Sequence, residues 1–258
     1  MTDGGQGIRV KHRDGTVIVT IDRPAVRNAV DLESARRIAA ALDELDRRED
    51  LLVGVITGAG GGFSAGMDLK ALAATGERPV APGRGPFGLC ARPPDKPLIA
   101  AVEGTAFGGG FEIALACDCV VAARDSLFAL PEVKRGLVAA AGGVLRLPAR
   151  IPRNVALEMA ITGEPIGAAR AYELGLVNRL TAPGGALDAA LEMAAQVAAN
   201  APLAVRATKS LVESSANWPP EQMFDHQQPL VQSVRESADA AEGTRAFVEK
   251  RPPRWTGK

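Results

Sequence analysis

The sequence predicts an α/β fold followed by a helical tail. Short apolar runs typical of buried strands occur at residues 52–57, 98–102 and 119–122, and glycine-rich or helical segments lie between them. From Gly184 onward the chain is rich in alanine with helical character, broken at Pro202, Pro219 and Pro220. This alternation is typical of the α/β class. We place a boundary near residue 195, which divides a core unit of residues 1–195 from a helical region of residues 196–258.

The first elements are predicted to be a hairpin and a helix. Residues 8–11 and 17–21 have the composition of short strands, and Asp14 with Gly15 between them is a common hairpin signal. Asp31 is a good N-cap for the segment that follows. Apolar residues recur there at helical spacing, at Leu32, Ala35, Ile38, Ala39, Leu42 and Leu45.

A long loop is expected between the strands at 52–57 and 98–102. Residues 75–97 contain six prolines and four glycines, and no periodic segment is visible among them. Long loops in compact domains often form lids or pocket walls, although disorder is the alternative. We expect this loop to contribute to a pocket wall.

Composition excludes several functional classes. The 258 residues are 47% hydrophobic and 23% charged, which is ordinary for a soluble globular protein. Thirty basic and thirty acidic residues cancel, so no global field attracts nucleic acid or anionic lipid. No window approaches 18 uninterrupted apolar residues, and residues 1–7 are polar without an apolar core of export-signal type. We therefore expect no nucleic-acid partner, no membrane span and no export.

The cysteines and histidines do not indicate a metal site. Cys90, Cys117 and Cys119 are odd in number, and the spacing of the last two is too short for a usual zinc or disulfide framework. The two histidines lie in no cluster of metal-binding residues. The sequence therefore predicts a reduced, cytoplasmic protein without a bound metal.

A serine hydrolase motif is present but its context is poor. Residues 62–66 read GFSAG, which matches the nucleophile elbow around Ser64, and His226 follows in the order of a catalytic triad. An elbow serine sits directly at a strand end, whereas six residues, four of them glycine, separate Thr57 from Ser64 here. His226 lies in a polar helical stretch typical of a surface. The hydrolase is therefore a remote alternative.

Two glycine-rich segments precede predicted helices. Residues 60–66 lead into Met67 and Asp68, and residues 108–110 lead into Phe111 and Glu112. Free N–H groups at a helix start favour an anion, and glycine lets a substrate approach the backbone. Either segment alone is explained by a tight turn between a strand and a helix. Together they could form an oxyanion hole.

Two glutamates could transfer protons beside these N–H groups. Glu112 lies in the first predicted helical turn, and Glu132 follows Pro131 at another helix start, with apolar neighbours in both cases. Acids at helix starts often only complement the helix dipole. An apolar setting also raises the pKa of a carboxyl group and suits it to acid–base catalysis. Whether the two carboxyl groups meet depends on the fold.

The chain resembles the enoyl-CoA hydratase/isomerase, or crotonase, family over nearly its whole length. The central motifs that carry the resemblance are TGAG at 57–60, FSAGMDLK at 63–70, KPLIAAV at 96–102, GGGFE at 108–112, ACD at 116–118 and LPE at 130–132. Further motifs lie near the ends, including RNA at 27–29, LRLP at 145–148, LGLVN at 174–178 and AFVEKR at 246–251.

The resemblance implies a fold, an assembly and a site. The fold is a crotonase-type spiral of ββα units with a C-terminal helical oligomerisation domain, which forms a homotrimer or a dimer of trimers. The family's oxyanion donors correspond to the N–H groups of Met67 and Gly109, and its two hydratase acids correspond to Glu112 and Glu132. The positions expected along the CoA moiety are Arg27, Ala65, Asp68 and Leu69, with Phe247 and Lys250 from a neighbouring subunit. No metal or redox cofactor is implied, because CoA is part of the substrate.

The implied reaction is the reversible addition of water to a 2-enoyl-CoA thioester, which gives a 3-hydroxyacyl-CoA. Residues 138–143 depart from the PGAGG pattern of many hydratases, and residues 107–116, 126–132, 143–148 and 251–255 are more similar to carnitinyl-CoA dehydratases. A carnitinyl-CoA dehydratase, acting on crotonobetainyl-CoA, or another acyl-CoA isomerase of the family is the alternative. A non-catalytic acyl-CoA-binding oligomer is a further alternative, although both acids are retained.

Overall fold

A central sheet organises the chain in the computed structural model, which describes residues 7–258. In this part of the chain the sheet has six strands, in the order β1 (Ile8–Arg13), β2 (Thr16–Ile21), β3 (Val53–Gly58), β6 (Leu98–Val102), β8 (Cys119–Ala123) and β11 (Arg179–Thr181). The first two strands form the predicted antiparallel hairpin, and each later strand is parallel to its neighbour. The polar stretch at residues 1–6, on which the prediction of no export depends, lies outside the described residues.

Helices cover both faces of this sheet, as its buried parallel strands require. Helix α1 (Leu32–Arg47) packs on one face, and the Asp31 carboxylate accepts a hydrogen bond of 2.8 Å from the Ser34 N–H, which confirms the predicted N-cap. Helix α7 (Ala186–Ala198) packs on the opposite face. Its alanines contact the side chains of one strand face, a cluster formed by Val53, Val55, Ile99, Ala101, Val121, Ala186, Ala190 and Ala194.

A second, smaller sheet positions the chemistry. Within the described residues it has three strands, β10 (Ile166–Gly167), β9 (Leu127–Ala129) and β7 (Thr105–Phe107). Strands β7 and β9 are parallel, with Phe107 opposite Ala129, so the segments that follow them leave the sheet at the same edge. These segments are α3 (Gly109–Ala116) after β7 and the 3-10 helix η2 (Pro131–Arg135) after β9. The remaining helices on this side are α4 (Gly143–Arg150), α5 (Arg153–Thr162) and α6 (Ala168–Glu173).

The proline-rich segment 75–97, named the wall here, has a defined conformation, and its role in lining a pocket stays a prediction. It follows α2 (Leu69–Thr75) and contains a minimal antiparallel pair that was not predicted, β4 (Val80–Ala81) and β5 (Gly85–Pro86). Arg84 is buried and fastens the segment to α1 through ion pairs of 2.7 Å with Asp43 and 2.6 Å with Asp46. The segment therefore has a fixed position beside α1.

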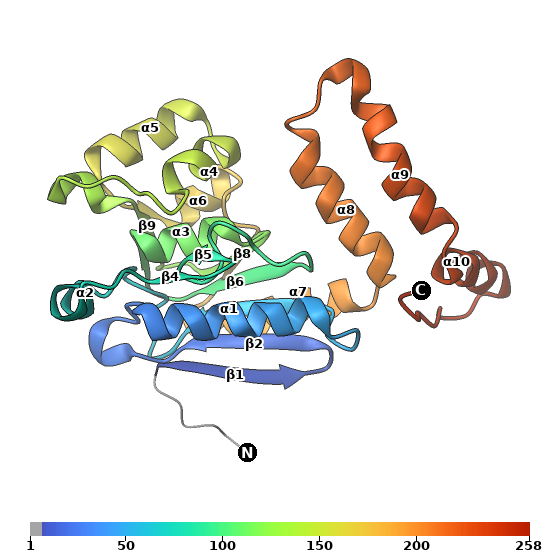
Figure 1. Ribbon diagram of the computed structural model, residues 1–258, viewed down its shortest axis with the longest axis horizontal. Helices are drawn as coiled ribbons and strands as arrows, with labels where there is room; N and C mark the ends of the chain where they lie inside the picture. The colour runs from blue at the N-terminus through green and yellow to red at the C-terminus, as the bar shows by residue number, and fades with distance from the viewer. Residues whose placement is uncertain (1–6) are drawn as a thin grey trace.

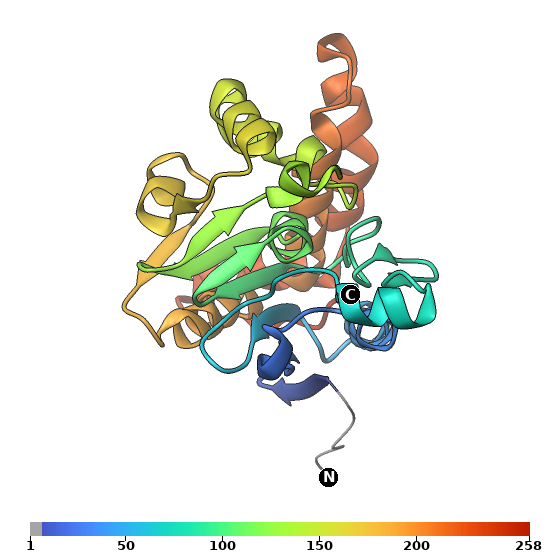
Figure 2. The ribbon, with the colours of Figure 1, turned by 90° about the vertical axis from the view of Figure 1, so that its left-hand side faces the viewer.

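The last part of the chain, from residue 202 onward, extends away from the sheets as a helical arm. It consists of α8 (Pro202–Ser215), the 3-10 helix η3 (Pro220–Gln222), α9 (Met223–Arg235) and α10 (Ala238–Glu249), and α8 and α9 lie side by side (Figures 1 and 2). Lys209 of α8 joins the arm to the core, because its ammonium group bonds to the Asp118 carboxylate at 2.8 Å and to the carbonyl of Pro94. The predicted boundary near residue 195 falls in the last turn of α7, and the division into a core of residues 1–195 and a helical region of residues 196–258 stays a prediction.

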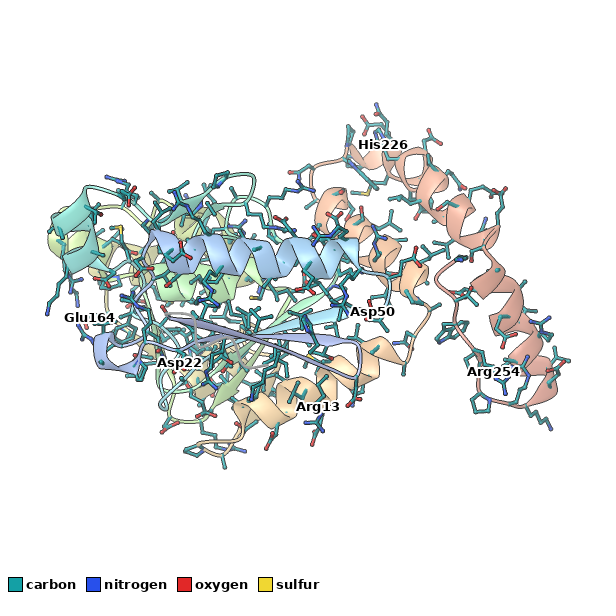
Figure 3. The ribbon with its side chains drawn as sticks, turned by 60° about the horizontal axis from the view of Figure 1, so that its bottom comes forward. Arg13, Asp22, Asp50, Glu164, His226 and Arg254 are labelled. Carbon is teal, nitrogen blue, oxygen red and sulfur yellow. The ribbon has the colours of Figure 1, made fainter. Side chains whose placement is uncertain are left out.

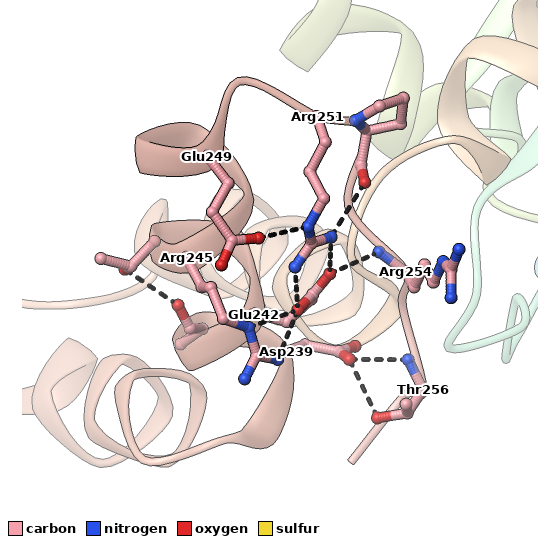
Figure 4. A network of polar contacts seen from close by, with 10 residues as sticks. Asp239, Glu242, Arg245, Glu249, Arg251, Arg254 and Thr256 are labelled. Carbon is pink, nitrogen blue, oxygen red and sulfur yellow. Dashed lines mark hydrogen bonds and ion pairs between the residues drawn. The ribbon is translucent and has the colours of Figure 1, made fainter.

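A polar network fixes the end of the chain against α10 (Figure 4). The Glu242 carboxylate accepts hydrogen bonds from the guanidinium groups of Arg245 and Arg251 and from the backbone N–H of Arg254. Asp239 accepts from the backbone N–H of Thr256 at 2.7 Å. Between residues 7 and 258, no helix has both the length and the apolar character needed to cross a membrane.

Candidate active site

The structure brings the two predicted glutamates to one place. Glu112 lies in the first turn of α3, and Glu132 is the second residue of η2, directly after Pro131. Because β7 and β9 are parallel neighbours, both helix starts project from the same edge. The Glu132 carboxyl group lies against the turn before Glu112, since a Cβ atom at Gly108 would be 3.0 Å from Glu132 Oε1. The two helix starts that the sequence indicated separately therefore form a single site.

The surroundings of Glu112 stabilise its carboxylate form. Its side chain is 3% exposed, and its Oε1 accepts hydrogen bonds from the backbone N–H groups of Ala141 at 2.7 Å and Gly143 at 2.9 Å. Gly143 is the first residue of α4, so the helix dipole also favours an anion there. Burial raises the pKa of Glu112 above its ordinary value, while these two N–H groups and the Arg146 cation oppose the rise. The carboxylate form therefore has specific partners in spite of its burial.

Glu132 is placed differently. Its Oε2 is buried and has no hydrogen-bond partner among the described residues. Burial raises the pKa of Glu132, and the nearby charge of Glu112 raises it further. A buried carboxyl oxygen without a donor is less costly when the group is protonated. Glu112 is thus a carboxylate that accepts hydrogen bonds from two N–H groups, and Glu132 is a carboxyl group suited to carry a proton.

The two N–H groups expected to form the oxyanion hole lie at adjoining segments. Met67 lies opposite Val30 in an isolated parallel bridge. The hydrogen bonds of this bridge join Val30 to the residues on either side of Met67, the carbonyl of Gly66 and the N–H of Asp68. The Met67 N–H therefore points away from Val30. Gly109 is the first residue of α3, and its N–H has no acceptor within the helix. A Cβ atom at Gly66 would lie 2.6 Å from the Gly109 nitrogen. Only glycine, at φ 84°, allows this approach of the Met67 segment to α3.

An aromatic ring borders the Gly109 position. Phe87 is 6% exposed and has a left-handed φ of 55°, and its ring lies directly against the Gly109 Cα. The wall of residues 75–97 supplies this ring. The wall is also tied to α4, because Arg146 Nη2 donates a hydrogen bond of 2.6 Å to the carbonyl of Cys90.

Sequence reasoning missed three participants in this site. They are the backbone N–H groups of Ala141 and Gly143, which hold Glu112, and the guanidinium of Arg146. The pair Gly142 and Gly143 before a helix repeats the signal recognised at residues 60–66 and 108–110. That repetition could have identified a third helix start in the site. No spacing in the sequence shows that it faces Glu112.

The four expected CoA positions in the core lie along one strip. The Ala65 N–H bonds to the carbonyl of Arg27 at 3.0 Å, and Asp68 with Leu69 begins α2 immediately beyond Met67. The Asp68 carboxylate caps α2 by accepting from the Ala71 N–H at 3.0 Å, and it pairs with Arg23 at 2.9 Å. Burial alone would raise the pKa of Asp68, but these contacts lower it overall. Asp68 therefore already has a structural role in the free chain.

The other two expected positions are not brought to this strip. Phe247 is 86% exposed near the end of α10, and Lys250 is the residue that caps this helix. Helix α10 lies at the opposite end of the molecule from α2 (Figure 1). Their contribution from a neighbouring subunit stays a prediction.

The geometry does not support a serine hydrolase. Ser64 is buried, and its hydroxyl donates a hydrogen bond of 2.8 Å to the carbonyl of Asn28. His226 lies on α9 and bonds to the side chain of Gln222 at 3.1 Å, on the helical arm that extends from the core (Figure 3). In residues 7–258, no group of three His, Cys, Asp or Glu side chains could hold a metal ion.

Comparison with known proteins gives consistent similarities. The family model described as enoyl-CoA hydratase/isomerase matches residues 11–258. A curated relative named carnitinyl-CoA dehydratase, from Escherichia coli O157:H7, is 44% identical over 258 residues, which cover 95% of this chain and 97% of the relative.

Two solved structures are similar over the full fold. One is described as enoyl-CoA hydratase from Mycobacterium tuberculosis H37Rv, with a TM-score of 0.96, 54% identity, and coverage of 98% of this chain and 100% of that chain. The other, described as carnitinyl-CoA hydratase from Mycobacterium avium, has a TM-score of 0.79, 42% identity, and coverage of 98% and 100% respectively.

Proposed function

Since the chain belongs to the enoyl-CoA hydratase/isomerase family, we propose that it is an enoyl-CoA hydratase, a carbon–oxygen lyase that reversibly adds water across the double bond of a 2-enoyl-CoA. The observation that carries the proposal is the pairing of Glu112, held by two N–H groups, with Glu132, whose buried Oε2 has no donor among the described residues. Two carboxyl groups in different environments can divide the roles of base and acid.

The thioester oxygen accepts hydrogen bonds from the N–H groups of Met67 and Gly109. Water adds at C3, and electron density moves through the double bond onto this oxygen as an enolate. The negative charge is larger in the transition state than in the substrate, so fixed donors lower the barrier. The strip from Arg27 to Leu69 would hold the CoA moiety, which places the reacting carbons beyond Met67.

Glu112 acts as the base and Glu132 as the acid. Glu112 takes a proton from the attacking water while the water oxygen bonds to C3, and Glu132 gives its proton to C2. The enolate electrons form the new C2–H bond, and the thioester carbonyl is restored. A proton then passes from Glu112 back to Glu132 through solvent, which resets the pair. The reverse sequence dehydrates a 3-hydroxyacyl-CoA, and no metal or redox cofactor takes part in either direction.

A carnitinyl-CoA dehydratase is the second candidate, because curated relatives with that name are 44% identical to this chain. The same acid–base pair would serve a substrate that bears a quaternary ammonium group. Aromatic faces bind such groups, and Phe87 beside Gly109 is the aromatic residue of the segment 75–97. Arg84 and Lys96 of the same wall do not oppose a cation there, because both are buried against α1. An acyl-CoA isomerase would use the same site without net addition of water.

The test is a hydration assay with crotonyl-CoA, longer 2-enoyl-CoA chains and crotonobetainyl-CoA. It compares the wild type with Glu132→Gln and with Glu164→Gln, a control at an exposed glutamate paired with Lys134. We expect turnover by the wild type and the control, and a loss of at least about 100-fold in Glu132→Gln. The catalytic proposal fails if the wild type hydrates none of the substrates. Preference for crotonobetainyl-CoA would favour the second candidate, and binding of acyl-CoA without turnover would favour a non-catalytic oligomer.

The assembly proposed for this enzyme is a homotrimer or a dimer of trimers in the cytoplasm. The helical arm supports it, because several large apolar side chains of α8 to α10 are exposed in the single chain, among them Val212, Phe224, Phe247 and Val248. These side chains would be buried if the arm packs against neighbouring subunits in an assembly. Light scattering coupled to size-exclusion chromatography distinguishes a monomer, a trimer and a hexamer.

A further inference from the structure

Arg146 links two backbone segments that border the site. It lies in the first turns of α4, and its Nη2 donates a hydrogen bond of 2.6 Å to the carbonyl of Cys90 in the wall that carries Phe87. Its Nη1 donates a longer bond of 3.3 Å to the carbonyl of Ala141. The N–H of the same residue, Ala141, donates to Glu112. One guanidinium group therefore spans from the aromatic wall to the loop that holds the proposed base.

The turn between the two donors to Glu112 is built around this side chain. Gly142 separates Ala141 from Gly143 and has a φ of 101°, a region that residues with a Cβ atom rarely adopt. A Cβ atom at Gly142 would overlap Nη1 of Arg146. The guanidinium therefore packs on the Gly142 backbone while the flanking N–H groups point to Glu112.

We propose that Arg146 is a positioning residue for the hydration reaction, which holds the two backbone donors of Glu112 and the Phe87 wall at a fixed separation. The inference rests on the proposed function, since that function makes Glu112 the base. It predicts that Arg146 affects turnover through the position and protonation of Glu112, without contact between Arg146 and the substrate.

The charges around Glu112 support this role. Arg146 from α4 is the charged side chain that lowers the pKa of Glu112, and the charge of Glu112 in turn raises the pKa of Glu132 on η2 and of Cys90 in the wall. Burial raises the pKa of the Cys90 thiol, so this group stays neutral. Arg146 is the cation of the set, and it lowers the pKa of Glu112. Its removal would leave a buried carboxylate beside a second carboxyl group with no opposing charge.

A purely structural role of Arg146 would give a different experimental result. If Arg146 only braced α4 against the wall, its loss would lower stability but would leave the pKa of Glu112 unchanged. Arg146→Met removes the charge and the donors while keeping an apolar stem. Arg146→Lys keeps the charge but cannot reach both carbonyls with a planar fork. Arg153→Met is the matched control, because Arg153 is an exposed arginine at the start of α5.

The experiment has two readouts. The first is the pH profile of kcat/KM for crotonyl-CoA. The second is a ¹³C NMR titration of protein labelled at the glutamate carboxyl carbon, in which the signal absent from Glu112→Gln identifies Glu112. For Arg146→Met we expect a higher pKa of Glu112, an acidic limb moved to higher pH, and a loss of about 100-fold in kcat/KM, as expected when a catalytic group is displaced by about 1 Å. For Arg146→Lys we expect a wild-type acidic limb with a reduced kcat, and for Arg153→Met wild-type behaviour.

The proposal is overturned if Arg146→Met leaves the pKa of Glu112 where it is in the wild type. If that variant does not fold, Arg146→Lys decides, and a wild-type kcat in it overturns the positioning role. If the wild type has no hydratase activity, the proposed function fails. The NMR titration still tests the link between Arg146 and Glu112 in that case, so the two failures are distinguishable.

Discussion

Gly109→Ala tests the packing of Phe87 against the proposed oxyanion donor. The new methyl group would come within 2.9 Å of three atoms of the Phe87 ring, whereas carbon atoms in contact prefer about 3.5–4.0 Å. The ring or the start of α3 must therefore move by more than about 1 Å. The ring cannot turn without displacing its neighbours, since Phe87 is only 6% exposed.

Overpacking of this kind costs about 1–3 kcal/mol of the free energy of unfolding. A shift of about 1 Å in a group that positions the substrate lowers the rate about 100-fold. We expect both losses in Gly109→Ala, measured by thermal unfolding and by kcat/KM for crotonyl-CoA. Phe87→Ala alone opens a cavity and costs about 3–5 kcal/mol. In the double variant the methyl group no longer meets the ring, so the added cost of Gly109→Ala should largely disappear.

Gly62→Ala is the control for the comparison of Gly109→Ala, Phe87→Ala and the double variant. Gly62 lies in the other glycine-rich segment, and a Cβ atom there would meet nothing within 4 Å. We expect wild-type stability and activity from it. The packing argument is wrong if Gly109→Ala behaves like Gly62→Ala, or if its losses are the same with and without the Phe87 ring.

Three further changes test the electrostatics and the frame of the site. The raised pKa of Glu132 means that its contribution to stability is complete below its unfolded pKa of about 4.3 and is lost as pH rises through the folded value. Glu132→Gln should therefore unfold at a higher temperature than the wild type near about pH 8, with a difference that vanishes near about pH 4; equal stability at both pH values would contradict this. Lys96→Met leaves the carbonyls of Leu45, Arg48 and Leu51 without their donor and should cost about 3 kcal/mol in denaturant unfolding, and a cost near zero would refute the account of this buried lysine. Asp31→Ala removes the cap of α1 and should cost about 1 kcal/mol, measured in the same way; no change would show that the cap contributes nothing.

Local features of the fold could be predicted because local chemistry determines them. Asp31 caps α1 through its own side chain, and the strand at residues 98–102 has the predicted bounds because its apolar run is complete. The resemblance to the enoyl-CoA hydratase/isomerase family supplied the spiral arrangement, which the match over residues 11–258 confirms. Neither conclusion required knowledge of contacts between distant residues.

Contacts distant in sequence could not be predicted in the same way. The approach of Glu132 to the Glu112 turn depends on the parallel pairing of β7 with β9, which three-residue strands do not reveal in a sequence. Lys96 and Arg84 are charged residues, for which exposure to solvent is the ordinary expectation, but both are buried against α1, where they have carbonyl and carboxylate partners. The donors to Glu112 are backbone groups, so side-chain identity gives no signal for them.

The central claim is that Glu112 and Glu132 act as one acid–base pair. It is tested most directly by kcat for crotonyl-CoA hydration in the wild type, Glu112→Gln, Glu132→Gln and the double variant. We predict that each single change lowers kcat by about 10²–10⁴-fold with little change in KM, and that the double variant is little worse than either, because groups that act together are not additive. Near-wild-type kcat in either single variant, or fully multiplicative losses in the double variant, would contradict the account.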